Sequence, residues 1–264
     1  MLVFNCTKAA ADFFTTTKKG EKSSPIEPAP HKTIAESIAM TNISADSEQS
    51  WHWLVHAKKV KRKNVLIVMD YHSRFVITLT DLKKGDELPF LNLLEHHLTV
   101  HVHEMMALVV DNPQTIEDSL EQYFNQHHSC AFHQRGDRSV QSHINDVLWH
   151  FERWVDEMGE VPLGVDLIGF DVFVNRLLRK RRAEKDYFYP QHEFLHAWLT
   201  HYGERSEFEA DRLIEGLKAT ERTAGQARYA GMMELTIQAD ALRSPDVHVD
   251  KSSNVISLDS YRKK

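Results

Sequence analysis

Three short apolar runs lie close together between residues 51 and 80, and they constrain the fold more than any other part of the chain. The runs read WHWLVHA, KNVLIVMD and RFVITLT, and they are rich in the β-branched and aromatic residues that favour strands. The basic turn KKVKRK separates the first two runs, and Tyr71-His72-Ser73 separates the second from the third. Strands joined by such short turns predict an antiparallel meander.

The clearest helical pattern follows later, over Ser142 to Met158. Its large apolar residues recur at steps of three and four and so share one face of a helix: Ile144, Val147, Leu148, Phe151, Val155 and Met158. Near the N-terminus, a strand over Met1 to Asn5 precedes a helix that Thr7 can cap. Further helices are predicted over 87–98, 115–126, 173–185, 191–202, 206–219 and 223–242.

These patterns predict an α+β protein, in which a small antiparallel sheet is packed by helices and is followed by a helical C-terminal half. Residues 15–50 are rich in Thr, Lys, Ser, Pro and Glu, and we expect them to form a flexible insertion with a weak helix around Ile34 to Met40. The expected organisation is an α+β core of residues 1–14 and 51–158, a helical region of 159–243 that packs on or extends this core, and a flexible tail of 244–264.

Composition excludes several classes of protein. The chain has 264 residues, of which 42% are hydrophobic, enough for a substantial core. Its net charge of −6 argues against a surface that is basic throughout. We find no apolar window long enough to span a membrane and no secretory signal at the N-terminus. Cys6 and Cys130 are too few for a disulfide framework, so we expect a cytoplasmic protein with no membrane partner.

Histidine is unusually frequent, with 17 residues in several bunches. Because the histidines are spread over the whole chain, we interpret the richness as a residue preference rather than as a site, although histidine is the commonest metal ligand. The bunch at 96–103 alternates with Leu98, Val100 and Val102. We expect the chain to pass from helix to strand there, with His101 and His103 on one face.

The sharpest motif is His192-Glu193-Phe194-Leu195-His196, an H-E-x-x-H pattern. On a helix, His192 and His196 lie one turn apart and can bind Zn²⁺, while Glu193 activates a bound water as general base. A third metal ligand would be Asp211 or Glu207. The alternative interpretation is an amphipathic helix whose apolar residues face the core, with the two histidines at the edge of the apolar face.

A second candidate is the polar face of the helix after Arg138. It contains a tryptophan, Trp149, although large aromatic residues are normally buried. This face predicts a binding surface made by these residues: Arg138, Ser139, Asn145, Asp146, Trp149 and Arg153. The alternative is that another element covers Trp149, with Ser139 or Ser142 capping the helix.

Two basic segments, 58–63 and 176–182, form a third candidate. The second runs towards Tyr187, Phe188 and Tyr189, and basic residues beside aromatic ones can hold phosphates and stack on bases. A hairpin turn and an exposed helix face are also ordinary places for lysine and arginine, so nucleic-acid binding is one alternative among several.

The motifs M-L-x-F-x-C-T-K at the N-terminus and R-S-V-x-x-x-x-N-D from Arg138 to Asp146 resemble a family of uncharacterised bacterial proteins, a domain of unknown function. The resemblance covers about residues 1–14 and 51–200. Family members read R-S-V-L-G-S-M-N-D at this place. Between R-S-V and N-D, this chain has Gln141-Ser142-His143-Ile144 instead of L-G-S-M. The resemblance implies a shared fold and carries no activity.

We therefore expect a non-catalytic binding or accessory module that needs no cofactor and whose partner is another protein. The first alternative is a zinc-dependent hydrolase that uses residues 192–196. The second is a nucleic-acid-associated protein.

Overall fold

The computed structural model describes residues 1–43, 50–181 and 185–243 of the chain. The chain divides into two units, Met1–Leu217 and Lys218–Lys264. The described part of the second unit is the later portion of helix α8 (Glu207–Arg243), and the predicted tail of 244–264 lies outside the described residues. None of the described helices is both long enough and apolar enough to cross a membrane.

A six-stranded sheet organises the first unit. Its strands follow the order β4 (Ile26–Glu27), β8 (Cys130–Gln134), β1 (Leu2–Cys6), β5 (Trp51–Val60), β6 (Lys63–Asp70) and β7 (Val76–Thr80). The pairs β5–β6 and β6–β7 are antiparallel, which confirms the predicted meander. The strands β2 (Thr16–Lys18) and β3 (Glu21–Ser23) form a separate hairpin.

The prediction of a purely antiparallel sheet is wrong, because the sheet is mixed. Strand β1 runs parallel to both of its neighbours, β5 and β8, and β8 runs parallel to β4. Parallel neighbours are joined by long connections that contain helices, so no turn between adjacent strands marks them in the sequence. The overall α+β class holds, since helices cover the sheet on both faces.

The alternation of side chains along β6 explains how both faces become buried. Leu66 and Val68 face one hydrophobic cluster, whereas Val65, Ile67 and Met69 face the other. A strand that is buried on both faces reads as a continuous apolar run, as KNVLIVMD does.

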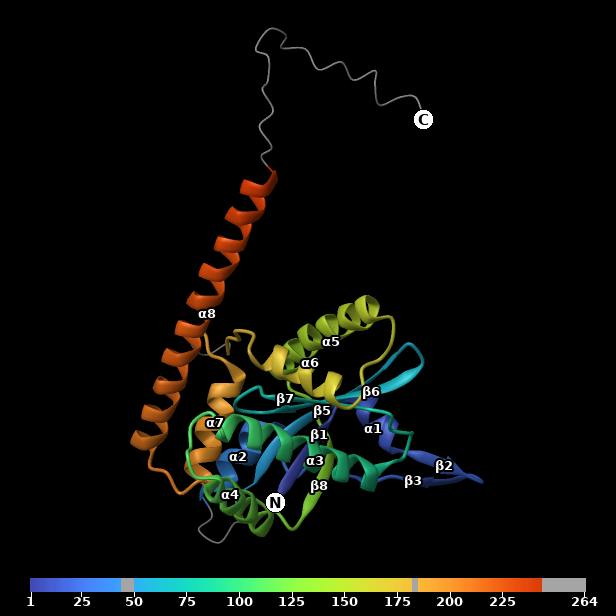
Figure 1. The fold of residues 1–264 in the computed structure, drawn as a ribbon. Coiled ribbons are helices and arrows are strands. Elements are labelled where there is room, and N and C mark those ends of the chain that lie inside the picture. Colours follow the sequence, from blue (N-terminus) through green and yellow to red (C-terminus); the bar gives the residue numbers. More distant parts are fainter. Residues whose placement is uncertain (44–49, 182–184, 244–264) are drawn as a thin grey trace, which may run out of the picture. The chain divides into compact units, whose positions relative to one another are not determined.

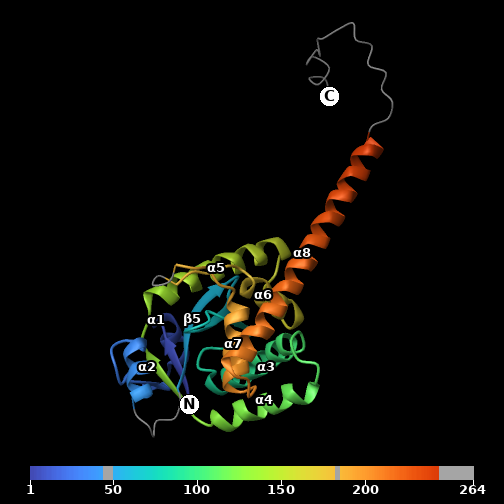
Figure 2. The same ribbon diagram turned by 90° about the vertical axis from the view of Figure 1, so that its left-hand side faces the viewer.

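Five helices contribute to the first cluster: α1 (Lys8–Phe14), α3 (Glu87–Met106), α4 (Pro113–Gln126), α7 (Pro190–His201) and the start of α8. The second cluster takes its helical residues from α2 (Ile34–Ile43), α5 (Arg138–Met158) and α6 (Val165–Asn175). Figures 1 and 2 both show α5 on one side of the sheet and α3 and α4 on the other.

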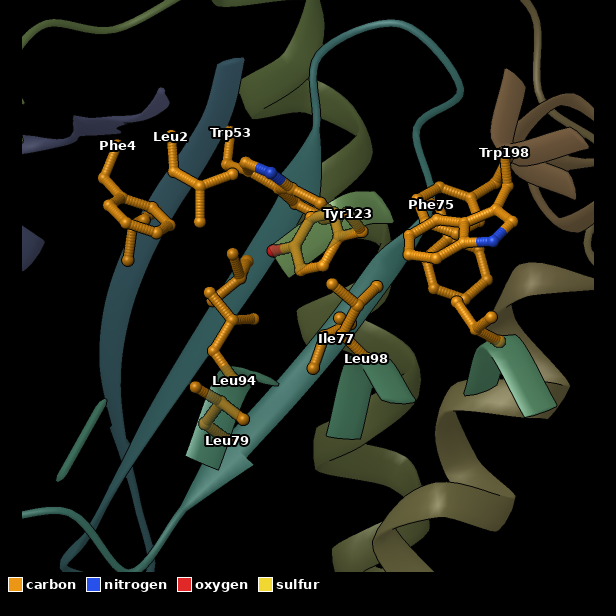
Figure 3. Packing of buried hydrophobic residues seen from close by; sticks show 14 of the residues in the cluster. Leu2, Phe4, Trp53, Phe75, Ile77, Leu79, Leu94, Leu98, Tyr123 and Trp198 are labelled. Atoms are coloured by element: carbon orange, nitrogen blue, oxygen red, sulfur yellow. The ribbon is translucent and has the colours of Figure 1, made fainter. Parts of the chain in front are cut away.

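The first cluster is built largely from aromatic rings. Figure 3 shows part of it, from Leu2 and Phe4 on β1 to Trp198 on α7. The ring of Phe75 stacks on Phe194 at 4.3 Å between centroids, and the buried Trp198 donates from Nε1 to Ser119 Oγ at 3.0 Å. This packing fixes α7 against the sheet.

Most predicted elements are present. Thr7 caps α1 by accepting from the Ala10 amide, and α2 lies where the weak helix was expected. Helix α5 starts at Arg138 rather than at Ser142, and its cap is Asp137, whose Oδ1 accepts from the amides of Ser139 and Val140. The alternative in which Ser139 or Ser142 caps this helix is therefore wrong.

Two predictions for local structure are also wrong. Helix α3 continues to Met106, so His97 and His101 lie one helical turn apart on its buried face, and no strand forms there. The predicted helix over 173–185 is instead α6, which ends at Asn175; Arg179 then pairs with Phe188 in an antiparallel bridge. The apolar spacing of Leu167, Phe170 and Val174 is the helical signal at the actual position.

Candidate binding site on helix α5

All six predicted binding residues belong to α5, and most of them are on its outer side. Trp149 is 53% exposed, so no other element buries it. The guanidinium of Arg153 lies 5.0 Å from the centroid of the Trp149 ring, a cation–π contact. Arg138, Asn145 and Asp146 are exposed, whereas Ser139 is half-buried near the start of the helix.

A hollow of about 440 Å³ opens beside Trp149. Of the predicted residues, only Asp146 and Trp149 line it. The other lining residues come from α5 and from the extended segment after α6: His143, His150, Leu177, Leu178, Arg179 and Lys180. The structure thus brings together two segments that the sequence did not connect.

One wall of this hollow is aromatic and aliphatic. The His150 ring contacts Trp149 at 4.8 Å and Phe173 at 5.5 Å between centroids. Leu178 adds an apolar side chain that is 55% exposed. Because single exposed aromatics are common and contiguous apolar patches are not, this grouping supports a contact surface.

A second part of the lining, made by Arg179 and Lys180, is positively charged. Arg179 is buried, and burial lowers the pKa of its guanidinium to about 10, while Asp146 on the rim raises it. Burial also lowers the pKa of His143 to about 4, with smaller contributions from Arg179 and Arg74. His143 is therefore neutral at pH 7, and the positive charge of this part of the lining comes from Arg179 and the exposed Lys180.

The sequence could not reveal that Arg179 is buried, because a basic run is typical of an exposed helix face. In the structure, this run is extended and its side chains separate. Arg179 turns inward, whereas Arg176 donates to Gln191 Oε1 at 3.0 Å and Arg181 forms an ion pair with Glu193 at 2.9 Å. Arg182, the end of the predicted basic segment, lies outside the described residues.

The other basic segment, 58–63, forms the β5–β6 hairpin next to α5. Lys61 donates to the carbonyls of Val155 and Gly159 at the end of α5, at 3.1 and 2.9 Å. Lys58 forms an ion pair with Glu152 at 2.6 Å. These contacts give the segment a structural role, and nucleic-acid binding through it stays a prediction.

The H-E-x-x-H motif lies on α7, whose apolar residues face the core as the amphipathic interpretation expects. His196 Nε2 lies 3.2 Å from Asp211 Oδ1 and 3.5 Å from Glu207 Oε2. His192 is buried instead, with its ring 5.2 Å from that of Tyr189. Glu193 is held by Arg181.

In the part of the chain that the structure describes, no group of three or more His, Cys, Asp and Glu side chains is placed to hold a metal ion. The geometry brings His196 and Asp211 together without His192. The zinc interpretation stays a prediction that only a metal measurement can test.

A second hollow, of about 380 Å³, lies where β5 begins and β6 ends, and the sequence did not indicate it as a site. Its polar lining includes Asp70 and four histidines from separate parts of the chain: His52, His72, His127 and His201. Asp70 accepts from Trp51 Nε1 at 2.6 Å and from the Ser73 amide at 2.6 Å, so both of its oxygens already have partners within the fold.

Residues 3–193 match the model of a protein family described as "Domain of unknown function (DUF6933)". The match covers well over half of the chain. This chain belongs to the DUF6933 family. Comparison with curated proteins and with solved structures found no match.

The boundaries of the DUF6933 match include one candidate site and exclude part of the other. It contains all of α5 and the segment of Leu177 to Lys180, and therefore the complete lining of the hollow beside Trp149. It ends at Glu193, so His196 and both candidate third ligands of the zinc motif lie beyond the DUF6933 region.

Proposed function

We propose that this DUF6933 protein is a binding or accessory module without chemistry of its own. Its contact surface is the outer side of α5 together with the hollow beside Trp149. We name this set of residues the α5 surface: Arg138, Asp146, Trp149, Arg153, Leu178, Arg179 and Lys180. The observation that carries the proposal is the exposure of Trp149 at 53% next to a hollow with an apolar wall.

The chemistry of the α5 surface favours one kind of partner. Four of its seven residues are cationic, and Asp146 is the only acidic one. Tryptophan and arginine are also enriched among the residues that contribute most to protein–protein binding. The partner we propose is a protein segment that carries acidic residues around one large apolar side chain, which would enter the hollow.

Selection from a displayed library of random peptides tests this proposal. The selection uses the full chain, with Trp149→Ala for counter-selection. We expect the enriched peptides to share acidic residues next to a large apolar residue. Phe124→Ala is the matched control, because Phe124 on α4 is also an exposed aromatic residue, at 42%, but lies outside the α5 surface. It should retain the same peptides.

Two outcomes would contradict the proposal. One is the absence of any enriched sequence class. The other is an enriched class that Trp149→Ala binds as well as the unmodified chain does.

A further inference from the structure

Two arginines near the α5 surface are buried without an acidic partner in contact. Arg74 is 5% exposed and Arg179 is 6% exposed. Among the described residues, Nε and Nη1 of Arg74 and Nε of Arg179 have no hydrogen-bond partner. Buried cations in proteins are normally paired, since leaving water without a counter-charge is costly. This arrangement therefore favours an anionic ligand.

The contacts that these arginines do make are weak. Arg179 Nη1 lies 3.4 Å from the His143 carbonyl oxygen. The Arg74 guanidinium lies 5.2 Å from the centroid of the Tyr71 ring. Asp70 attracts Arg74 through space, but its two oxygens are already occupied by Trp51 and Ser73. Asp146 attracts Arg179 through space as well, but none of these acidic groups forms an ion pair with either arginine among the described residues.

Two of the residues with unpartnered groups line the hollow beside Trp149. Arg179 and His143 both line it, and Nδ1 of His143 also has no partner among the described residues. Lys180 also lines the hollow and adds a second positive charge, whereas Arg74 acts on the His143 ring from outside the lining. Asp146 is the carboxylate on the rim and would repel an incoming anion.

We propose that this hollow binds a phosphate monoester, with the phosphate on Arg179 and the organic group on Trp149 and Leu178. A phosphate monoester carries close to two negative charges at pH 7, which matches the two cations that line the hollow, Arg179 and Lys180, better than the single charge of a carboxylate does. Arginine also presents several donors to phosphate oxygens. The proposal rests on the proposed function, because it specifies the group by which a partner enters the α5 surface.

Calorimetric titration of the full chain with phenyl phosphate tests this inference. Benzoate and inorganic phosphate are the comparison ligands. We expect phenyl phosphate to bind more tightly than benzoate, which has one charge, and than inorganic phosphate, which lacks the ring. The absence of heat with phenyl phosphate up to about 10 mM, a concentration that would detect even millimolar affinity, would overturn the inference.

Three variants locate the ligand. Arg179→Gln should weaken phenyl phosphate binding at least about tenfold, since it removes a charged hydrogen-bond donor. Asp146→Asn should strengthen binding, because it removes the repelling carboxylate. Lys59→Gln removes an exposed charge from the β5–β6 hairpin and should leave binding unchanged.

Thermal unfolding without ligand distinguishes a ligand-binding role of Arg179 from a structural one. Removing a buried cation that has no partner should leave the melting temperature of Arg179→Gln unchanged or higher. If Arg179→Gln does not fold, the Asp146→Asn variant still tests the inference. Unchanged or weaker binding of phenyl phosphate by Asp146→Asn would overturn it.

The source of the phosphate is decided by comparison of a phosphotyrosine peptide with phenyl phosphate. Tighter binding of the peptide supports a phosphorylated partner protein, and equal binding supports a small phosphorylated compound. Peptide selection that depends on Trp149 without any phosphate binding would refute this inference alone. Phosphate binding without any enriched peptide would refute the proposed function alone.

Discussion

Asp171 and Asn175 lie one turn apart on α6, and together they satisfy the outer edge of strand β7. Asn175 accepts from the Val76 amide and donates to the Val76 carbonyl, each at 2.8 Å. Asp171 accepts from the Thr78 amide at 2.9 and 3.1 Å. Two residues along a strand and four along a helix both span about 6 to 7 Å, so the two spacings match. These two side chains of α6 thus make the backbone hydrogen bonds that a neighbouring strand would otherwise make with β7 at Val76 and Thr78.

Replacement of Asn175 tests this edge contact. Asn175→Ala leaves a buried amide and a buried carbonyl of Val76 without partners, and we expect a loss of about 2 to 4 kcal/mol in the free energy of unfolding. Urea denaturation measures it. Asn145→Ala, at an exposed position on α5, is the control and should change stability by less than about 0.5 kcal/mol. Equal effects of the two substitutions would show that the α6 contact is not stabilising.

Trp149 and Trp198 should respond in opposite ways to the same substitution. Trp149→Ala should change the free energy of unfolding by less than about 0.5 kcal/mol, because the side chain is largely exposed. Trp198→Ala should cost about 3 to 5 kcal/mol, because it removes a fully buried ring that also donates to Ser119. Unfolding of the Trp149→Ala variant would mean that Trp149 supports the fold and would remove the basis of the α5 surface.

Several buried histidines predict a loss of stability in mild acid. Burial lowers the pKa of His52, His97 and His127 from 6.5 to about 4. The unfolded chain therefore takes up protons below pH 6.5 that the folded chain does not take up until about pH 4. Stability from these groups is complete above pH 6.5 and is lost as the pH falls through this window.

Urea denaturation at pH 7, 6 and 5 checks this prediction. His52→Gln should reduce the slope of stability against pH by up to one proton, about 1.4 kcal/mol per pH unit. His128→Gln, at an exposed position, should leave the slope near that of the unmodified chain. A slope that is the same in both variants would contradict the assignment to His52.

Local patterns in the sequence predicted much of this fold. The β5–β6–β7 meander and the buried face of α5 depend on neighbouring residues, and both were predicted. The parallel strands were not predicted, because β8 has only five residues and its partners lie far away in the chain.

The lining of the candidate site was predicted only in part for the same reason. Trp149 could be identified because a tryptophan is unusual on the polar face of a helix, and Asp146 because it shares that face. The burial of Arg179 beside the hollow depends on the end of α6 at Asn175 and on the bridge to Phe188, which are tertiary features. A basic run of residues does not show which of its side chains is buried.

Metal content tests the zinc alternative. Elemental mass spectrometry of the full chain, purified without a histidine tag and loaded with zinc before desalting, should find much less than one zinc per chain. The reason is that His192 does not join His196 and Asp211 in one group. About one zinc per chain, lost in His192→Ala, would establish the zinc site instead.

The affinity of the enriched peptide for the α5 surface tests the central claim most directly. Fluorescence anisotropy of the labelled peptide would be measured with the unmodified chain, Trp149→Ala and Phe124→Ala. The proposed function predicts that Trp149→Ala weakens binding at least about tenfold, as expected for a central aromatic contact, while Phe124→Ala binds normally. Equal affinities for all three proteins would contradict it.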